Sequence, residues 1–220
     1  MSTTEPGSAG LRIGFVPGVT LTKWRRIWAE RFRGVPLEVT EVPESGQRDV
    51  LVSGEVDMCF VRLPIETAGL HAIPLYEEQP VVWMAKEFLL AALDEVTVED
   101  LAEFRILSDY GPDSIDLAVY SAAALRVPLS VARTQSRKDM VHRPVVDADP
   151  TTIALAWRVD NGNEWIDEFI GVVRGRTANS SRSSRERGVN AKPARQPQKK
   201  QNQAGRRPDG RKTKRPRRSA

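Results

Sequence analysis

Residues 11–18 read LRIGFVPG, and this stretch begins the pattern that decides the fold. The apolar run 11–16 predicts a buried strand, which the following Pro-Gly pair ends. A helix is expected next, capped by Thr20 or Thr22, because four large apolar residues then recur at helical spacing: Trp24, Ile27, Trp28 and Phe32. Gly34 and Pro36 follow in the order typical of a helix end.

The same order of elements repeats in the next thirty residues. Residues 37–42 predict a second strand, Ser45 is a candidate N-cap for a short helix that closes at Gly54, and residues 57–61 (DMCFV) predict a third strand. Strands that alternate with helices are typical of right-handed βαβ units. The sequence therefore predicts an α/β fold with a parallel sheet.

The rest of the folded part is less regular. We expect extended segments at 72–76, 80–84, 105–107, 126–128 and 151–157. We expect helical segments at 88–93, 97–104, 114–124 and 163–173, with Thr97 and Asn163 as caps. In TTIALAW, residues 151–157, large side chains alternate with Ala, as a strand with one face of large residues requires.

Charge is distributed unevenly along the 220 residues. Residues 1–173 contain 16 Lys and Arg against 27 Asp and Glu, whereas residues 174–220 contain 17 against 2. Every Trp, Phe and Tyr also precedes residue 174, so the C-terminal segment has almost no apolar surface to offset the entropy cost of folding. We expect a disordered leader over 1–10, a folded domain over 11–177 and a disordered basic tail over 178–220.

Several classes of protein are disfavoured. Cys59 is the only cysteine and lies in an apolar strand, and His71 and His142 have no neighbour at metal-ligand spacing, so we expect neither a disulfide nor a metal. No phosphate-loop, dinucleotide or nucleophile-elbow motif occurs, which favours a protein without cofactor or enzymatic activity. No export signal or membrane-spanning run is evident, and we expect a cytoplasmic protein.

Six segments in order resemble the effector-binding (substrate-binding) domain of LysR-type transcriptional regulators. They include LRIGFVPG, LVSGEVDMCFVRLP at 51–64, LHAIPLYEEQPVVWMAK at 70–86 and LAALDEVTVEDLAEF at 90–104. VPLSVARTQSRKDMVHRPVVD at 127–147 and TTIALAW then resemble the closing strands of that domain. The resemblance covers about residues 11–178.

The resemblance implies a two-lobed fold like that of type 2 periplasmic binding proteins, with a small effector between the lobes and side-by-side homodimers. Residues 11–64 and the last helix would build the first lobe, and the stretch between them a shortened second lobe. Because ten residues precede the first strand, we expect a stand-alone domain without the family's N-terminal helix-turn-helix. The expected role is non-enzymatic effector binding in a regulatory protein.

Five residues are candidate ligand contacts: Gly18, Thr20, Ser45, Arg62 and Ser130. The turn with Gly18 and Thr20 precedes a helix N-terminus, where free N–H groups would suit a carboxylate, the candidate class of effector. Ser45 holds the equivalent place in the second repeat, and Arg62 follows the third strand at the edge where open α/β sheets bind ligands. Ser130 matches a cleft-side serine that the resemblance implies.

The basic tail is a candidate for nucleic-acid contact without sequence preference. Its clustered cations are Lys199, Lys200, Arg206, Arg207, Arg211, Lys212, Lys214, Arg215, Arg217 and Arg218. A solubilising appendage, or an arm folded back on the acidic domain, is an equal interpretation. The alternative function is thus a degenerate dimerisation scaffold whose tail binds nucleic acid.

Overall fold

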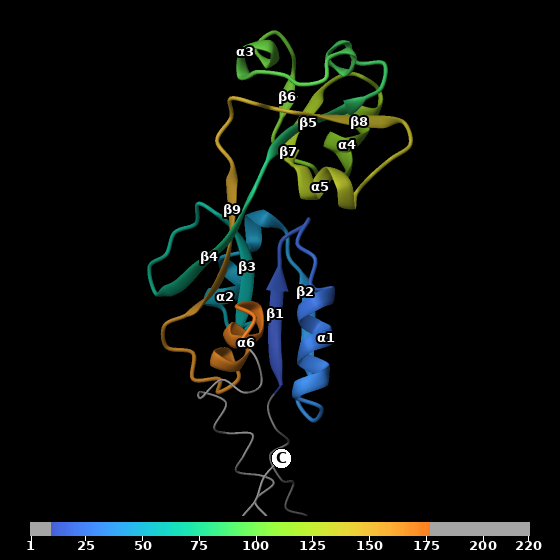
Figure 1. Cartoon of the computed structure of the whole chain (residues 1–220). Coiled ribbons are helices and arrows are strands. Elements are labelled where there is room, and N and C mark those ends of the chain that lie inside the picture. Colours follow the sequence, from blue (N-terminus) through green and yellow to red (C-terminus); the bar gives the residue numbers. More distant parts are fainter. Residues whose placement is uncertain (1–9, 177–220) are drawn as a thin grey trace, which may run out of the picture. The chain divides into compact units, whose positions relative to one another are not determined.

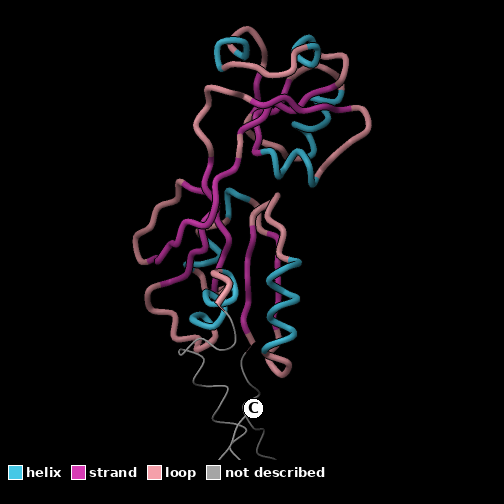
Figure 2. The backbone as a smooth tube through the Cα atoms, viewed as in Figure 1, coloured by secondary structure: helices cyan, strands magenta, loops and turns pink. Residues whose placement is uncertain are grey.

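The computed structural model describes residues 10–176, which form two β-sheets with helices packed against them (Figure 1, Figure 2). The first sheet has the order β2-β1-β3-β9-β4, and its strands are β1 (Leu11–Phe15), β2 (Leu37–Glu41), β3 (Met58–Leu63), β4 (Leu70–Glu78) and β9 (Thr151–Arg158). The second has the order β6-β7-β5-β8, and its strands are β5 (Pro80–Ala85), β6 (Ile106–Leu107), β7 (Ala124–Pro128) and β8 (Met140–Pro144).

Each sheet and its helices make one lobe. The first lobe contains α1 (Thr22–Arg31), the 3₁₀ turn η1 (Glu44–Gly46), α2 (Asp49–Val52) and α6 (Ile166–Val173). The second lobe contains the 3₁₀ turn η2 (Leu89–Ala92), α3 (Val98–Leu101), α4 (Pro112–Val119) and α5 (Leu129–Thr134). The predicted two-lobed α/β fold is confirmed. The predicted tail, 178–220, lies outside the described residues.

The two predicted βαβ units are present, because β1 pairs in parallel with both β2 and β3. The predicted composition of the first lobe was wrong, however. β9 lies antiparallel between β3 and β4 in the first sheet, so both β4 and β9 belong to this lobe. The assignment failed because packing selects strand partners that lie more than seventy residues apart in sequence, and no local sequence pattern reveals them.

The alternation along β9 works as predicted. Ile153 and Leu155 pack into the cluster that α1 and α6 cover, which also holds Trp28 and Phe169. Ala154 and Ala156 point to the opposite face of the sheet, where they pack with Leu51 of α2 and with β3. Large residues thus fill one side of the sheet, and the small residues on the other side leave room for α2 to pack closely against it.

The second sheet is also covered on both faces. Val81 and Trp83 of β5 pack with α4 and α5, whereas Val82 and Met84 pack with η2 and α3.

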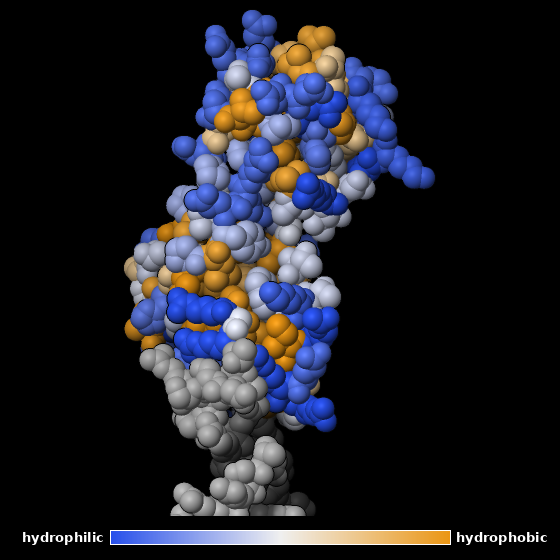
Figure 3. Space-filling model, in the orientation of Figure 1, coloured by the Kyte–Doolittle hydropathy of each residue, from blue (hydrophilic) through white to orange (hydrophobic). Residues whose placement is uncertain are grey.

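On the molecular surface shown in Figure 3, apolar residues lie between hydrophilic ones. Leu89 and Tyr120 are among the large apolar side chains that remain exposed.

Helix caps were predicted with mixed success. Thr97 caps α3 as expected, and with Asp100 it forms a capping box in which each side chain accepts a bond from the other's backbone N–H. Neither Thr20 nor Thr22 caps α1: Leu21 precedes that helix and makes no side-chain cap bond. Ser45 lies inside η1 and caps no helix, because α2 begins only at Asp49.

The helices also differ from the predicted ones in three places. The helix expected over 114–124 ends at Val119, and β7 already begins at Ala124. Asn163 accepts a bond from the N–H of Trp165 at 3.0 Å, in the turn just before α6. Helix α5 was not predicted, because six residues are too few for a helical period to show in sequence.

Candidate functional site

The turn after β1 lies against the start of α5 in the second lobe. Gly18 has a φ of 93°, a conformation that favours glycine, and a Cβ placed on it would lie 3.0 Å from the Cβ of Ser130. It would also lie 3.1 Å from the backbone nitrogen of Val131. Two of the predicted ligand residues, 112 positions apart, therefore meet at a point where only glycine fits without displacement.

Arg62, near the end of β3, is the centre of a buried polar cluster. Its guanidinium donates from Nε to Glu78 at 2.9 Å, from Nη1 to Glu44 at 2.7 Å and from Nη2 to the carbonyl of Pro17 at 3.0 Å. The side chains of Arg62 and Glu78 are both only 3% exposed. Every nitrogen of this guanidinium is therefore already engaged inside the protein.

Gln47 holds the backbone of β3 in place beside this cluster. Its side-chain amide accepts a bond from the N–H of Arg62 at 2.8 Å and donates to the carbonyl of the same residue at 3.0 Å. Both Gln47 and Arg62 are buried. The segment that follows β2 is thus fixed to the end of β3, which sets the direction of the Arg62 side chain.

Two contacts join this cluster to the second lobe. The hydroxyl of Tyr110 donates to Glu44 at 2.9 Å and lies 3.4 Å from Nη1 of Arg62. The hydroxyl of Ser130 donates to Glu78, the last residue of β4. The Arg62 cluster, defined as Glu44, Arg62, Glu78, Tyr110 and Ser130, therefore connects both lobes by charged hydrogen bonds.

The protonation states follow from this geometry. Burial opposes the charge on Arg62, but the attraction of Glu78 and Glu44 outweighs burial and holds the pKa of Arg62 above its usual value. Burial and the neighbouring Glu44 carboxylate also raise the pKa of Tyr110 above its usual value. The phenol thus stays protonated and acts as a donor to Glu44.

A cavity of about 710 Å³ opens beside the Arg62 cluster. The first lobe contributes Pro17, Glu41, Pro43, Glu44, Ser45 and Gln47 to its wall, and the second lobe contributes Ser108, Asp109, Tyr110, Gly111 and Gln135. The first-lobe part of the wall lies just after β1 and β2, at the carboxyl ends of strands in the parallel part of the first sheet. Ligands of open α/β sheets bind at this edge.

The five predicted ligand residues divide at this site. Ser45 lines the cavity. Gly18, Ser130 and Arg62 do not line it; they take part in the contacts between the two lobes. Thr20 is exposed and does not line the cavity. Glu41, Glu44 and Asp109 make the wall acidic, and the guanidinium of Arg62 is paired with Glu44 and Glu78.

Sequence reasoning missed the partners of Arg62. Neither Glu44 nor Glu78 stands out in the sequence from the other carboxylates, yet Glu78 is 5% exposed and pairs with Arg62. No sequence pattern marks Tyr110 as a partner of Arg62, because it lies in a loop between β6 and α4. A buried arginine requires buried acceptors, and this requirement was the available signal.

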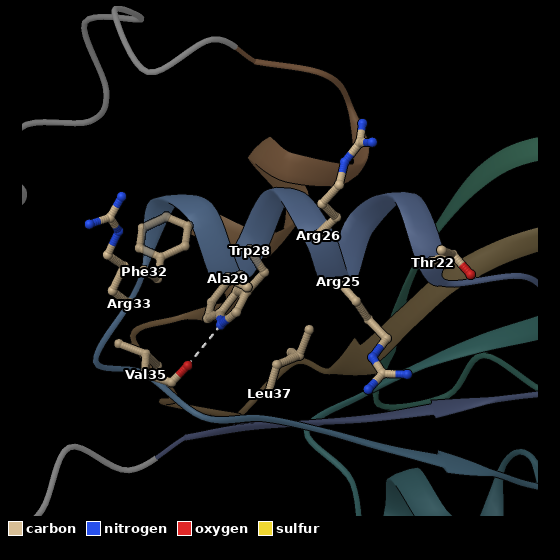
Figure 4. Close-up of a pocket in the computed structure, with 9 residues that line it drawn as sticks. All are labelled: Thr22, Arg25, Arg26, Trp28, Ala29, Phe32, Arg33, Val35 and Leu37. Atoms are coloured by element: carbon tan, nitrogen blue, oxygen red, sulfur yellow. Dashed lines mark hydrogen bonds between the residues drawn. The ribbon is translucent and has the colours of Figure 1, made fainter.

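A second cavity, of about 480 Å³, lies between α1 and the start of β2 (Figure 4). Trp28 is at its apolar floor and donates from Nε1 to the carbonyl of Val35 at 3.0 Å. Arg25, Arg26 and Arg33 also line it; Arg25 points toward the side of Leu37, whereas Arg26 points away from it. No residue predicted to bind a ligand lines this groove.

Other site types find no support among residues 10–176. This part of the chain contains no group of three or more His, Cys, Asp or Glu placed to hold a metal ion. Cys59 is fully buried in β3, and burial raises the pKa of its thiol to about 12. No helix in the described residues has the length and apolarity to cross a membrane.

Comparison with known proteins identifies relatives of the chain. A probable hydrogen peroxide-inducible genes activator of Mycobacterium avium is 35% identical over 108 residues, which cover 48% of this chain and 35% of that protein. The HTH-type transcriptional regulator AlsR of Bacillus subtilis is 28% identical over 109 residues, or 48% of this chain and 36% of the regulator. The chain thus spans about a third of the length of these relatives.

Solved structures show the same fold. The effector binding domain of a BenM variant superposes with a TM-score of 0.64 at 20% identity, covering 76% of this chain and 93% of that one. The reduced OxyR regulatory domain from Pseudomonas aeruginosa gives 0.60 at 18% identity, covering 76% and 96%. The model of the LysR substrate binding domain matches residues 5–124, more than half of the sequence. The chain therefore belongs to the family of LysR substrate binding domains.

Proposed function

We propose that this chain is a non-enzymatic effector-binding domain of a cytoplasmic LysR-type transcriptional regulator, and that a small molecule enters the 710 Å³ cavity. The observation that carries the proposal is the wall of that cavity, to which both lobes contribute, each with several polar side chains. A volume of this size suits a small organic ligand. The family match and the regulators among its relatives support a regulatory role.

The Arg62 cluster offers a route by which an effector would act. Glu44 lines the cavity and also binds Arg62 and Tyr110, so a ligand that draws on Glu44 competes with a bond between the lobes. A ligand shifts a conformational equilibrium only through such a difference in contacts between two states. We therefore propose that effector occupancy changes how firmly the lobes engage.

Peroxide sensing through a thiol is not part of this proposal, although some relatives are described as peroxide-inducible activators. The thiolate is the species that reacts with peroxides, and it requires access and a lowered pKa. Cys59 has neither, since it is fully buried and its pKa is raised to about 12. We propose instead that the effector binds without covalent chemistry.

The proposal is tested by a ligand screen on the full chain, with melting temperature as the readout. The wild type is compared with Ser45→Trp, which fills the cavity, and with Ser53→Trp, an exposed serine at the end of α2 that does not line it. Effectors should stabilise the wild type and Ser53→Trp but not Ser45→Trp. A ligand that stabilises all three proteins equally would place binding elsewhere.

Self-association and nucleic-acid contact remain proposals from the sequence. The basic cluster at Lys199–Lys200 and beyond lies outside the described residues, and the comparisons support effector binding and not the scaffold alternative. A gel shift with the full chain and with residues 1–177 at two salt concentrations tests the tail, since phosphate contacts weaken steeply with salt. Sedimentation of both proteins tests for a homodimer.

A further inference from the structure

We propose that the effector of this domain carries a positive charge, as an amine, amidine or guanidine does, and is not a carboxylate. This inference rests on the proposed function, which places the effector in the cavity between the lobes. The site itself is argued from the cavity and the family. The charges around it decide the class of ligand.

The wall of the cavity is acidic. Glu41, Glu44 and Asp109 line it, and its eleven lining residues include no Lys, Arg or His. Ser45 and Gln135 add neutral polar groups from the first and the second lobe. A carboxylate ligand would meet three like charges in this space, whereas a cation would meet three partners.

Arg62 does not reverse this balance. Its guanidinium contacts Glu44 and Tyr110 of the wall, but Glu44 and Glu78 both pair with it, so the three charged side chains together carry one negative charge. Its guanidinium is also 3% exposed, and its remaining donor binds the carbonyl of Pro17. A ligand carboxylate could reach Arg62 only by displacing a buried ion pair, which is costly.

Acceptor atoms remain free for a cation. Both bonds that Glu44 accepts, from Arg62 and Tyr110, go to its Oε2 atom, and Oε1 accepts none from the described residues. The Glu44 side chain is 39% exposed, so Oε1 has room for a second partner. Glu41 is exposed and forms no ion pair with any residue between 10 and 176. Asp109 accepts bonds from the N–H of Gly111 and the hydroxyl of Ser114.

The experiment compares ligands that share one skeleton and differ in charge. Benzamidine, benzamide and benzoate form one such set, and 1,4-diaminobutane, 1,4-butanediol and succinate form another. Each is titrated by calorimetry into the full chain at pH 7 and at two salt concentrations. The cation of at least one set should bind more tightly than its neutral and anionic partners, and added salt should weaken that binding.

Two variants separate the wall charges from the rest of the surface. Glu41→Gln should weaken binding of the cation by roughly three- to fivefold, as expected for losing one partly exposed ionic partner. Glu103→Gln removes an exposed carboxylate that does not line the cavity and should leave affinity unchanged. Glu41 is the better test residue than Asp109, because Asp109 also bonds the first turn of α4.

The outcomes distinguish the ligand class from the proposed function. If an anion binds more tightly than its cationic partner and Ser45→Trp abolishes that binding, the charge assignment is wrong and the effector site stands. If the cation binds but Glu41→Gln and Glu103→Gln weaken it equally, the acidic wall does not select it. If no compound of either set binds, and no compound of a broad effector screen binds, both proposals are wrong.

Discussion

Removing the charge of Arg62 should destabilise this domain more than any surface substitution. In Arg62→Met the methionine fills part of the space, but the Glu78 carboxylate, 3% exposed, loses the guanidinium that compensates its charge. Glu44 and the carbonyl of Pro17 lose charged donors at 2.7 and 3.0 Å. Breaking a buried ion pair on one side costs about 3–5 kcal/mol. For a domain of this size the melting temperature should fall by roughly 6–20 °C.

The assay is unfolding in guanidinium chloride followed by tryptophan fluorescence, with two companion variants. Arg62→Met/Glu78→Gln removes both charges and should recover much of the loss, because an unpaired buried charge is the main cost. Arg48→Met breaks the surface pair with Glu66, whose side chain is 64% exposed, and should cost less than about 1 kcal/mol.

Two results would refute this reasoning. A loss below about 1 kcal/mol for Arg62→Met would mean that water reaches Glu78 and that the cluster is not buried in solution. A double variant no more stable than Arg62→Met would mean that lost packing, and not the unpaired carboxylate, causes the effect. Either result would also mean that the charge of Arg62 does not help to hold the two lobes together.

Three further predictions concern the first lobe and its contact with the second. Bonds from Arg12 outweigh burial and lower the pKa of Asp57, so its stabilising effect is present at neutral pH. Asp57→Asn should therefore cost about 1–2 kcal/mol at pH 7 in urea unfolding, and the difference from wild type should start to shrink near pH 4 and be lost as pH falls through the lowered pKa of Asp57. Cys59 should not react with a disulfide reagent in the native protein and should react fully after denaturation; native reactivity would contradict its burial. Gly18→Ala should lower stability by roughly 1–3 kcal/mol in thermal unfolding, and Ser130→Gly should recover part of this loss; an unchanged melting temperature would mean that the turn relaxes freely.

Local patterns accounted for much of the first lobe. Apolar runs ended by Pro and Gly gave β1, β2 and β3, and the alternation over 151–157 gave β9 with its large and small faces. Such patterns are readable because the period of a strand or helix is imposed on each residue by the backbone itself. The cap at Thr97 was readable for the same reason, since a cap and the N–H groups that it binds lie within one turn.

Ser45 shows how a sequence position can have another role than the one predicted. It was predicted as a helix cap and a ligand contact; it caps no helix, but it lines the cavity because η1 follows the carboxyl end of β2. Arg62 shows the converse. Its place at the sheet edge was readable from sequence, but its engagement by two carboxylates was not.

The sequence by itself determined the α/β class, the parallel βαβ start, the family resemblance and the division of charge between residues 1–173 and the segment after them. Only the tertiary structure decided that β4 and β9 complete the first sheet and that Gly18 meets Ser130. It alone joined Glu44, Arg62 and Tyr110 beside an acidic cavity. The physical reason is range: periodicity and caps act between neighbours in sequence, whereas burial and ion pairing select partners by distance in space.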